Sequence, residues 1–114
     1  MTQVVDPAKG SGSSPASGRR YVAVLLQFSN TASHELSGNA NADADLVASG
    51  GRTYVPAHVT LKDCGSALPQ YQAAPGKTTN SCVAFEVGKS ADITKVQFYP
   101  AAGAATDYGE WLVP

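Results

Sequence analysis

The stretch that decides the fold is Tyr21-Val22-Ala23-Val24-Leu25-Leu26-Gln27-Phe28-Ser29-Asn30. Every second residue is strongly apolar, which is the signature of a β-strand with one face in a core. That face carries Val22, Val24, Leu26 and Phe28. The other face carries Tyr21, Ala23, Leu25 and Gln27, and it is more apolar than a solvated face usually is. We therefore expect a strand with a core on one side and a partial cover on the other.

Further strand-like runs stand before and after this stretch, and no window keeps the spacing of an amphipathic helix. The runs are Thr2–Val5, Asp45–Ala48, Arg52–Val55, Val59–Lys62, Thr78–Val87, Thr94–Tyr99 and Gly109–Val113. Segments rich in Gly, Pro, Ser or Asn separate them and predict loops at 6–18, 30–41 and 63–77, the first of them flexible. In Thr78–Val87, one face holds Val83, Phe85 and Val87, and the other holds Cys82, Ala84 and Glu86. The pattern predicts an all-β, immunoglobulin-like antiparallel sandwich of about seven strands in one domain over residues 1–114.

Composition limits the possible partners. The chain has 114 residues, of which 43% are hydrophobic and 8% aromatic, enough for one small core. Its formal net charge is −1, and the eight Lys and Arg residues are scattered along the sequence. Nucleic acid is therefore not an expected partner. No apolar run is long enough to cross a bilayer, so we expect no membrane insertion by this segment.

Cys64 and Cys82 are the two cysteines, and they bracket a span that contains Pro69, Pro75 and Gly76. A hairpin-like return of this span would bring them together, and we predict one disulfide formed in an oxidising compartment. Closing such a loop would stabilise the fold by about 3 kcal/mol. The alternative is a pair of reduced, half-buried thiols. A metal site is disfavoured because neither a CxxC spacing nor a histidine pair accompanies the cysteines.

A series of short motifs recurs in a familiar order. They are Arg20-Tyr21-Val22-Ala23-Val24 ending in Asn30, Asp45-Leu46-Val47 with Gly50-Gly51-Arg52-Thr53-Tyr54, Ala74-Pro75-Gly76-Lys77 before Val83-Ala84-Phe85-Glu86-Val87, and Gly109-Glu110-Trp111. In this order they resemble the secreted immunoglobulin-like family of unknown function found in lipoproteins and membrane-anchored proteins of Gram-positive bacteria. That family is similar in fold to the immunogenic secreted antigen of mycobacteria. The cysteine pair is not part of its common pattern, and the family lends no catalytic residues.

The resemblance and the cysteine pair together imply an extracellular or cell-surface location, and the Ala- and Gly-rich composition suits an actinobacterial source. Met1-Thr2-Gln3 lacks the basic and apolar stretches of a signal peptide. We therefore expect a signal or anchor upstream, removed from this chain.

Motifs for catalysis are weak, and we expect neither enzyme activity nor a cofactor. Gly76-Lys77-Thr78 resembles the end of a phosphate-binding loop, but Tyr71 stands where glycine is needed and a strand follows instead of a helix. His34 and His58 are the two histidines. His34 is interpreted as a surface residue beside Glu35, and His58 as a partly buried hydrogen-bonding residue.

One weak metal candidate is the run Asn39-Ala40-Asn41-Ala42-Asp43-Ala44-Asp45, which places a side-chain oxygen at every second residue. This spacing suggests an irregular calcium site of Asn39, Asn41, Asp43 and Asp45. The helix-flanked calcium loop is excluded, because Ala44 and Gly50 stand where glycine and glutamate are required. A solvated loop with Asx turns is the alternative.

The favoured function is a non-catalytic binding or adhesion module that recognises a protein or a cell-envelope component. Its predicted contact residues are Leu68 and Tyr71 on the disulfide-held loop, and Tyr21 and Leu25 on the outer face of the strand. Packing of the loop onto its own sandwich is the alternative for Leu68 and Tyr71. A second hypothesis is a structural spacer that holds a lipoprotein or sensor at the surface, with weak self-association through an open strand edge. A third, carbohydrate binding, would rest on Trp111 with Tyr99 or Tyr108.

Overall fold

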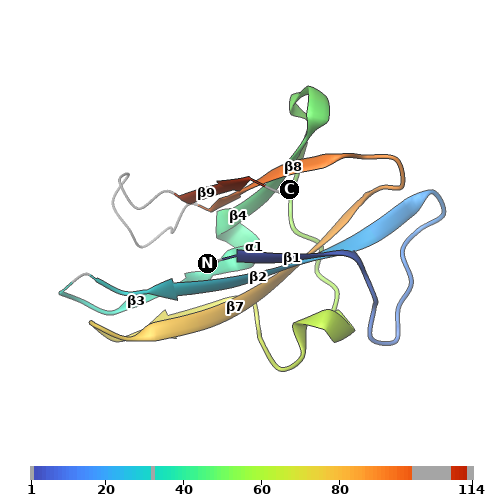
Figure 1. Cartoon of the computed structure of the whole chain (residues 1–114). Coiled ribbons are helices and arrows are strands. Elements are labelled where there is room, and N and C mark those ends of the chain that lie inside the picture. Colours follow the sequence, from blue (N-terminus) through green and yellow to red (C-terminus); the bar gives the residue numbers. More distant parts are fainter. Residues whose placement is uncertain (1, 32, 99–108, 113–114) are drawn as a thin grey trace.

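The computed structural model describes residues 2–31, 33–98 and 109–112 (Figure 1). The strands are β1 (Thr2–Ala8), β2 (Arg19–Ser29), β3 (Leu36–Asn39), β4 (Ala44–Ala48), β5 (Thr53–Tyr54), β6 (Gln70–Ala73), β7 (Thr78–Gly88), β8 (Ile93–Phe98) and β9 (Gly109–Leu112). Between them stand one short helix, α1 (Ala40–Asp43), and two 3₁₀ turns, η1 (Ser49–Gly51) and η2 (Lys62–Cys64).

The strands form a sheet of order β1-β2-β7, a sheet of order β5-β4-β8-β9 and the pair β3-β6. Neighbouring strands run antiparallel throughout these sheets. The two larger sheets lie as two layers (Figure 1), and their facing side chains make the main core. Phe85 and Val22 come from one layer, and Leu46 and Val96 from the other, all fully buried. The predicted all-β antiparallel fold is confirmed.

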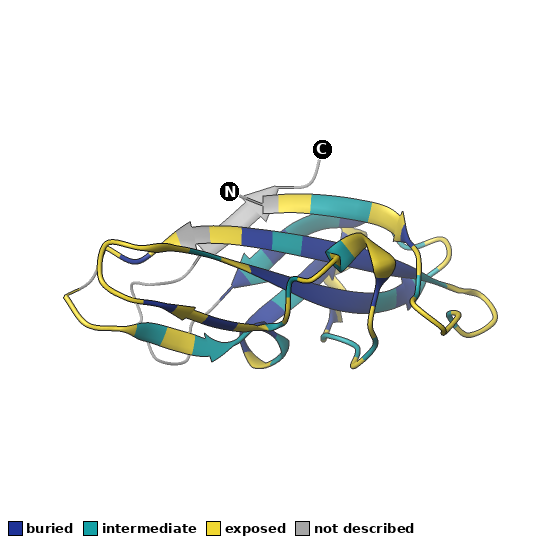
Figure 2. Ribbon diagram, turned by 90° about the horizontal axis from the view of Figure 1, so that it is seen from below, coloured by how far each residue is buried: buried dark blue, intermediate teal, exposed yellow. Residues whose placement is uncertain are grey.

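β2, which contains the apolar alternation from Tyr21 onward, is the central strand of its sheet. β2 pairs with β7 without interruption from Arg19 opposite Gly88 to Ser29 opposite Thr78. Eleven residues in each strand carry this pairing, and most of those near the middle are buried (Figure 2). The predicted strands at 78–87, 94–99 and 109–113 appear as β7, β8 and β9. β7 runs one residue further, to Gly88, and β8 begins one residue earlier, at Ile93, while Tyr99 and Val113 lie outside the described residues.

Three sequence-based boundaries are wrong. β3 and β6 occupy parts of the predicted loops 30–41 and 63–77. They form strands because they pair with each other, Leu36 opposite Ala73, and this long-range pairing leaves no pattern in the local sequence. The predicted flexible loop at 6–18 begins later, since β1 runs to Ala8 and Gly10 forms a bridge with Leu61. The predicted strand at 59–62 is instead that isolated bridge followed by η2.

A second, smaller core covers the other face of the β1-β2-β7 sheet. Tyr21, Ala23, Cys82 and Ala84 point to this face and are buried. Leu61, 1% exposed, packs against them from an irregular segment. The predicted cover over the second face of β2 is therefore confirmed, and Leu61 is its most deeply buried side chain from outside the sheet.

Candidate functional site

An arch of chain, residues 57–69, crosses the second face of the sheet and is fixed to β7 at both ends. The Ala57 amide donates to the Ala84 carbonyl at 2.8 Å, and the Cys82 amide donates to the Leu68 carbonyl at 3.1 Å. Midway, the Lys62 amide bonds the Lys9 carbonyl at 2.7 Å, and the Lys9 amide bonds a carboxylate oxygen of Asp63 at 2.7 Å. The arch therefore has a fixed course although it is not a regular element.

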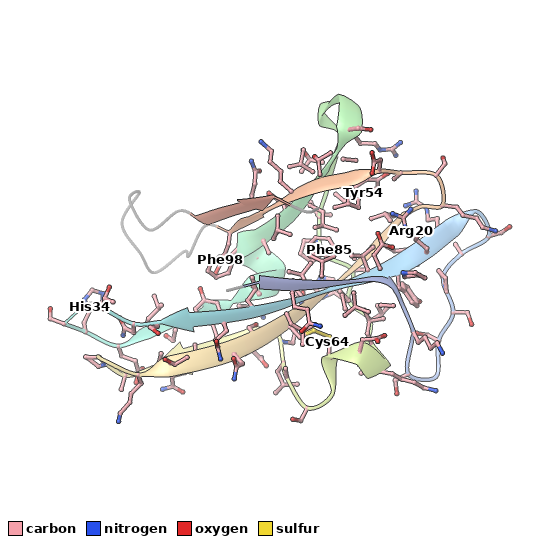
Figure 3. The ribbon with its side chains drawn as sticks, in the orientation of Figure 1. Arg20, His34, Tyr54, Cys64, Phe85 and Phe98 are labelled. Atoms are coloured by element: carbon pink, nitrogen blue, oxygen red, sulfur yellow. A yellow bond between two sulfur atoms is a disulfide. The ribbon has the colours of Figure 1, made fainter. Side chains whose placement is uncertain are left out.

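The predicted disulfide joins Cys64 of the arch to Cys82 of β7, with the Cα atoms 5.6 Å apart. Cys82 is 1% exposed and belongs to the smaller core, whereas Phe85 belongs to the main core. Figure 3 shows Cys64 and Phe85 on opposite sides of the β2–β7 layer. The prediction that the bond ties a loop to a strand, without bridging the two sheets, is confirmed.

The arch encloses a cleft of about 260 Å³ beside the disulfide. Apolar side chains and both half-cystines make most of its wall, and the polar contributors are few. The lining residues are Asn41, His58, Val59, Thr60, Leu61, Cys64, Gly65, Ala67, Leu68, Pro69, Cys82 and Ala84. An apolar hollow with a small number of polar groups is the usual form of a recognition site.

Two polar residues of this cleft were not predicted as contact residues, although Asn41 was one of the calcium candidates. Asn41 reaches the cleft from α1, and its buried Oδ1 has no hydrogen-bond partner within the described ranges. His58 is exposed and lines the cleft, so its interpretation as a partly buried residue is wrong. Its position before a strand-like run gave no sign of an arch. His34 is exposed, as expected.

Two of the four predicted contact residues lie beside the cleft. Leu68 keeps 61% of its surface exposed at the cleft wall. Leu25 is half-buried and lines a neighbouring hollow of about 270 Å³, on the other side of Ala67. Because Leu25 pairs with Cys82, and the Cys82 amide bonds the Leu68 carbonyl, the two leucines flank the same residue of β7.

The other two predicted contact residues, Tyr71 and Tyr21, face inward, which corrects the expectation that they meet a partner. Tyr71 is 4% exposed in β6, where its ring packs edge-on against Phe98 and its hydroxyl donates to Asp43 at 2.7 Å. Burial, followed by this hydrogen bond, raises the pKa of Tyr71 well above its ordinary value. Tyr21 is 2% exposed in the smaller core. Packing onto the protein's own sandwich, the alternative for Tyr71, is what the structure has.

The four calcium candidates lie on three elements, Asn39 at the end of β3, Asn41 and Asp43 in α1, and Asp45 in β4. Asn39 caps α1, its side chain accepting from the Asn41 amide at 2.9 Å. Asp43 is buried and accepts from Tyr71, whereas Asp45 lies on β4 opposite Gln97. No group of three or more His, Cys, Asp or Glu suited to a metal occurs in the part of the chain that the structure describes. For the carbohydrate hypothesis, Tyr99, Tyr108 and the Trp111 side chain lie outside the described residues.

The fold and the site thus define an all-β antiparallel module with an arch stapled to its central sheet by one disulfide. No family model matches the chain, and no curated protein matches it in sequence. Among solved structures it is similar to one from Bacillus subtilis, described as a "putative lipoprotein (ycdA)", with a TM-score of 0.69 and 14% identity. The match covers 99% of this chain and 36% of that one, so the chain spans about a third of its neighbour's length.

At this identity the likeness shows the fold alone, and the resemblance to the immunoglobulin-like family stays a prediction. Within the described ranges, no helix is long and apolar enough to cross a membrane.

Proposed function

We propose that this protein is an extracytoplasmic, non-catalytic recognition module of a secreted or membrane-anchored bacterial protein. In this proposal a protein or cell-envelope partner is held at the arch cleft. The disulfide supports an oxidising compartment, because such bonds persist outside the cytoplasm. The structural neighbour, described as a lipoprotein candidate, has the same fold and agrees with that location.

The observation that carries the proposal is the state of Leu68. Its side chain is exposed, yet its backbone is fixed. The Leu68 carbonyl accepts from the Cys82 amide and from the Ser81 hydroxyl at 2.9 Å, and the next carbonyl, of Pro69, accepts from the same hydroxyl at 2.8 Å. The disulfide at Cys64 lies four positions earlier in the chain. An apolar side chain on a backbone that is already fixed costs less conformational entropy when it is buried against a partner.

The test is a photo-reactive phenylalanine analogue placed at position 68 and, as a matched control, at position 55. Val55 is 73% exposed, is also aliphatic and does not line the cleft. On intact cells of the source bacterium we expect position 68 to give one discrete adduct and position 55 to give none. Excess unlabelled wild-type protein should suppress the adduct, whereas Leu68→Asp protein should not. Equal labelling from both positions, or equal competition by Leu68→Asp, would overturn the proposal.

A structural spacer with weak self-association is the second candidate. It is favoured by the outer edges of β1 and β3, which pair with no other strand in the described part of the chain. Pro7 and a register shift between Val5 and Ala8 blunt the β1 edge. Sedimentation velocity at rising concentration separates the candidates. A spacer that self-associates forms dimers whose strength is unchanged by Leu68→Asp, and it gives no competed adduct on cells.

A further inference from the structure

A second hollow, of about 250 Å³, lies away from the arch, between the turn that joins β4 to β5 and the turn that joins β7 to β8. It is lined by Ala48, Ser49, Arg52, Tyr54, Gly88, Ser90, Ala91 and Asp92. The Ser49 amide donates to the Asp92 carbonyl at 2.8 Å, so the two turns are bonded to each other. None of these residues lines the arch cleft.

Arg20 holds one wall of this hollow in place. Its guanidinium donates to the carbonyls of Gly88, Lys89 and Ala91 at 2.6, 3.1 and 2.8 Å. The same guanidinium grips both carboxylate oxygens of Asp6, at 2.7 and 3.0 Å, and the bond to Asp6 raises the pKa of Arg20. In Figure 3, Arg20 lies toward the end of the molecule opposite His34. The wall is therefore ordered before any ligand arrives, and the Arg20 charge is already matched by Asp6.

Two charged residues line the hollow, Arg52 and Asp92, and the Arg20 charge attracts Asp92 from outside it. The Arg52 guanidinium lies over the Tyr54 ring, with 5.1 Å between the guanidinium carbon and the ring centre. Asp92 is exposed at the same hollow, and no ion pair joins it to Arg52 in the described ranges. A guanidinium held over an aromatic ring can still donate its N–H groups to a carboxylate. The hollow thus presents a carboxylate-binding fork and a separate carboxylate.

The charge pattern restricts the ligand. A simple anion would be attracted by Arg52 and repelled by Asp92, and a simple cation would meet the reverse. A molecule with a carboxylate and an ammonium group satisfies both, and the Ser49 and Ser90 hydroxyls can accept or donate the remaining hydrogen bonds. The volume suits one residue-sized molecule.

We propose that this hollow binds the zwitterionic head of a free α-amino acid, with Arg52 on its carboxylate and Asp92 on its ammonium group. The site is independent of the arch cleft, so either proposal can fail without the other.

The test follows backbone amide shifts of the whole chain by NMR while glycine or L-alanine is added at millimolar concentration. We expect saturable shifts at Ser49, Arg52, Ser90 and Asp92. Sodium acetate, methylammonium chloride and methyl β-glucoside are the anion-only, cation-only and neutral polyol probes. Each should bind at least about tenfold more weakly than L-alanine.

The variants Arg52→Gln and Asp92→Asn should each weaken L-alanine binding at least about tenfold, and Asp92→Asn should also strengthen acetate binding. Both side chains are exposed, so neither change threatens the fold. Arg19→Gln and Glu35→Gln remove the same charges from exposed positions outside the hollow and should change nothing. The proposal would be overturned if neither amino acid gave a saturable shift, or if acetate bound equally well or the sugar bound better. Unchanged binding of L-alanine by Arg52→Gln and Asp92→Asn would overturn it as well.

Discussion

The Tyr71 hydroxyl donates a 2.7 Å hydrogen bond to Asp43, and both residues are buried. The bond joins β6 to the end of α1, two elements that are 28 residues apart in sequence. A buried carboxylate without a partner is unfavourable, so this pair makes the ordering of one segment depend on the other.

Replacing Tyr71 with phenylalanine is therefore expected to lower the free energy of unfolding by about 1–3 kcal/mol, because Asp43 loses its donor. Urea unfolding followed by fluorescence measures the change. Tyr21→Phe is the matched control. It also removes a buried tyrosine's hydroxyl, but the hydrogen bond from that group to Ser13 is long, at 3.4 Å, and we expect a loss within about 0.5 kcal/mol. Equal losses in the two variants would contradict the role given to the Asp43 bond.

The same pair predicts a loss of stability in alkali. The pKa of Tyr71 is raised in the folded protein above its ordinary value of about 10. The folded state therefore holds a proton that the unfolded state releases. This contribution is complete below about pH 10 and is lost as the pH rises further. Unfolding free energies measured from about pH 9 to about pH 11 should fall more steeply for the wild type than for Tyr71→Phe. Parallel curves would rule the effect out.

Gly38 makes room for this hydroxyl. It pairs with Tyr71, and a methyl group at position 38 would overlap the Tyr71 hydroxyl. Gly38→Ala should cost about 1–3 kcal/mol of unfolding free energy by displacing the ring. At Gly88 an added methyl group would meet only ordinary contacts, the nearest 3.5 Å away, which makes Gly88→Ala the control for a strand glycine. Thermal unfolding of the two variants should separate them clearly, and similar melting temperatures would refute the steric argument.

Replacing both Cys64 and Cys82 with serine should reduce the unfolding free energy by about 3 kcal/mol, because the unfolded chain regains the entropy of the open loop. The loss should also be local. Amide exchange should quicken most at Ala57 and Cys82, whose amides fix the ends of the arch. The Val83 amide, in the β2–β7 ladder, is the internal reference. Uniform acceleration at all three amides would show that the bond does not act on the arch in particular.

Arg20→Lys keeps the charge but removes the planar fork that reaches Asp6 and three carbonyl groups. We expect a loss of about 1–3 kcal/mol and faster amide exchange in the turn at 88–91. Arg19→Lys is the control on the adjacent, exposed position, where one 3.4 Å bond to Glu86 is at stake. Equal effects of the two changes would contradict the clamp.

The long strands could be predicted from sequence because their alternation is local. A few neighbouring residues are enough to assign the main-core face of each strand, which carries Val22, Val24, Val83 and Phe85. The same rule assigns Cys82 to the second face. β3 and β6 could not be recognised in the same way. Each has four residues, and Gln70–Ala73 lies between Pro69 and Pro75, which read as loop. Their pairing depends on a contact between distant parts of the chain.

The site was predictable to the same extent. The disulfide and the exposure of Leu68 follow from composition and from position on a loop. The arch has no periodic pattern, so its course, its cleft and the entry of Asn41 and His58 are set by tertiary hydrogen bonds alone. Tyr71 was assigned to the surface because its strand was not recognised.

The two-sided burial of the β2–β7 pair raises a question of alignment. When a strand is apolar on one face only, a slip of one residue exposes the whole apolar set and is strongly disfavoured. Here both faces are covered, so shifting β7 by one residue would exchange one buried row for another, at a smaller hydrophobic cost. Such a slip would turn the Cys82 side chain to the face of the sheet that packs on the main core, and Cys82 could then no longer bond to Cys64. The disulfide can therefore form in one register of β2 and β7 and cannot form in the registers shifted by one residue.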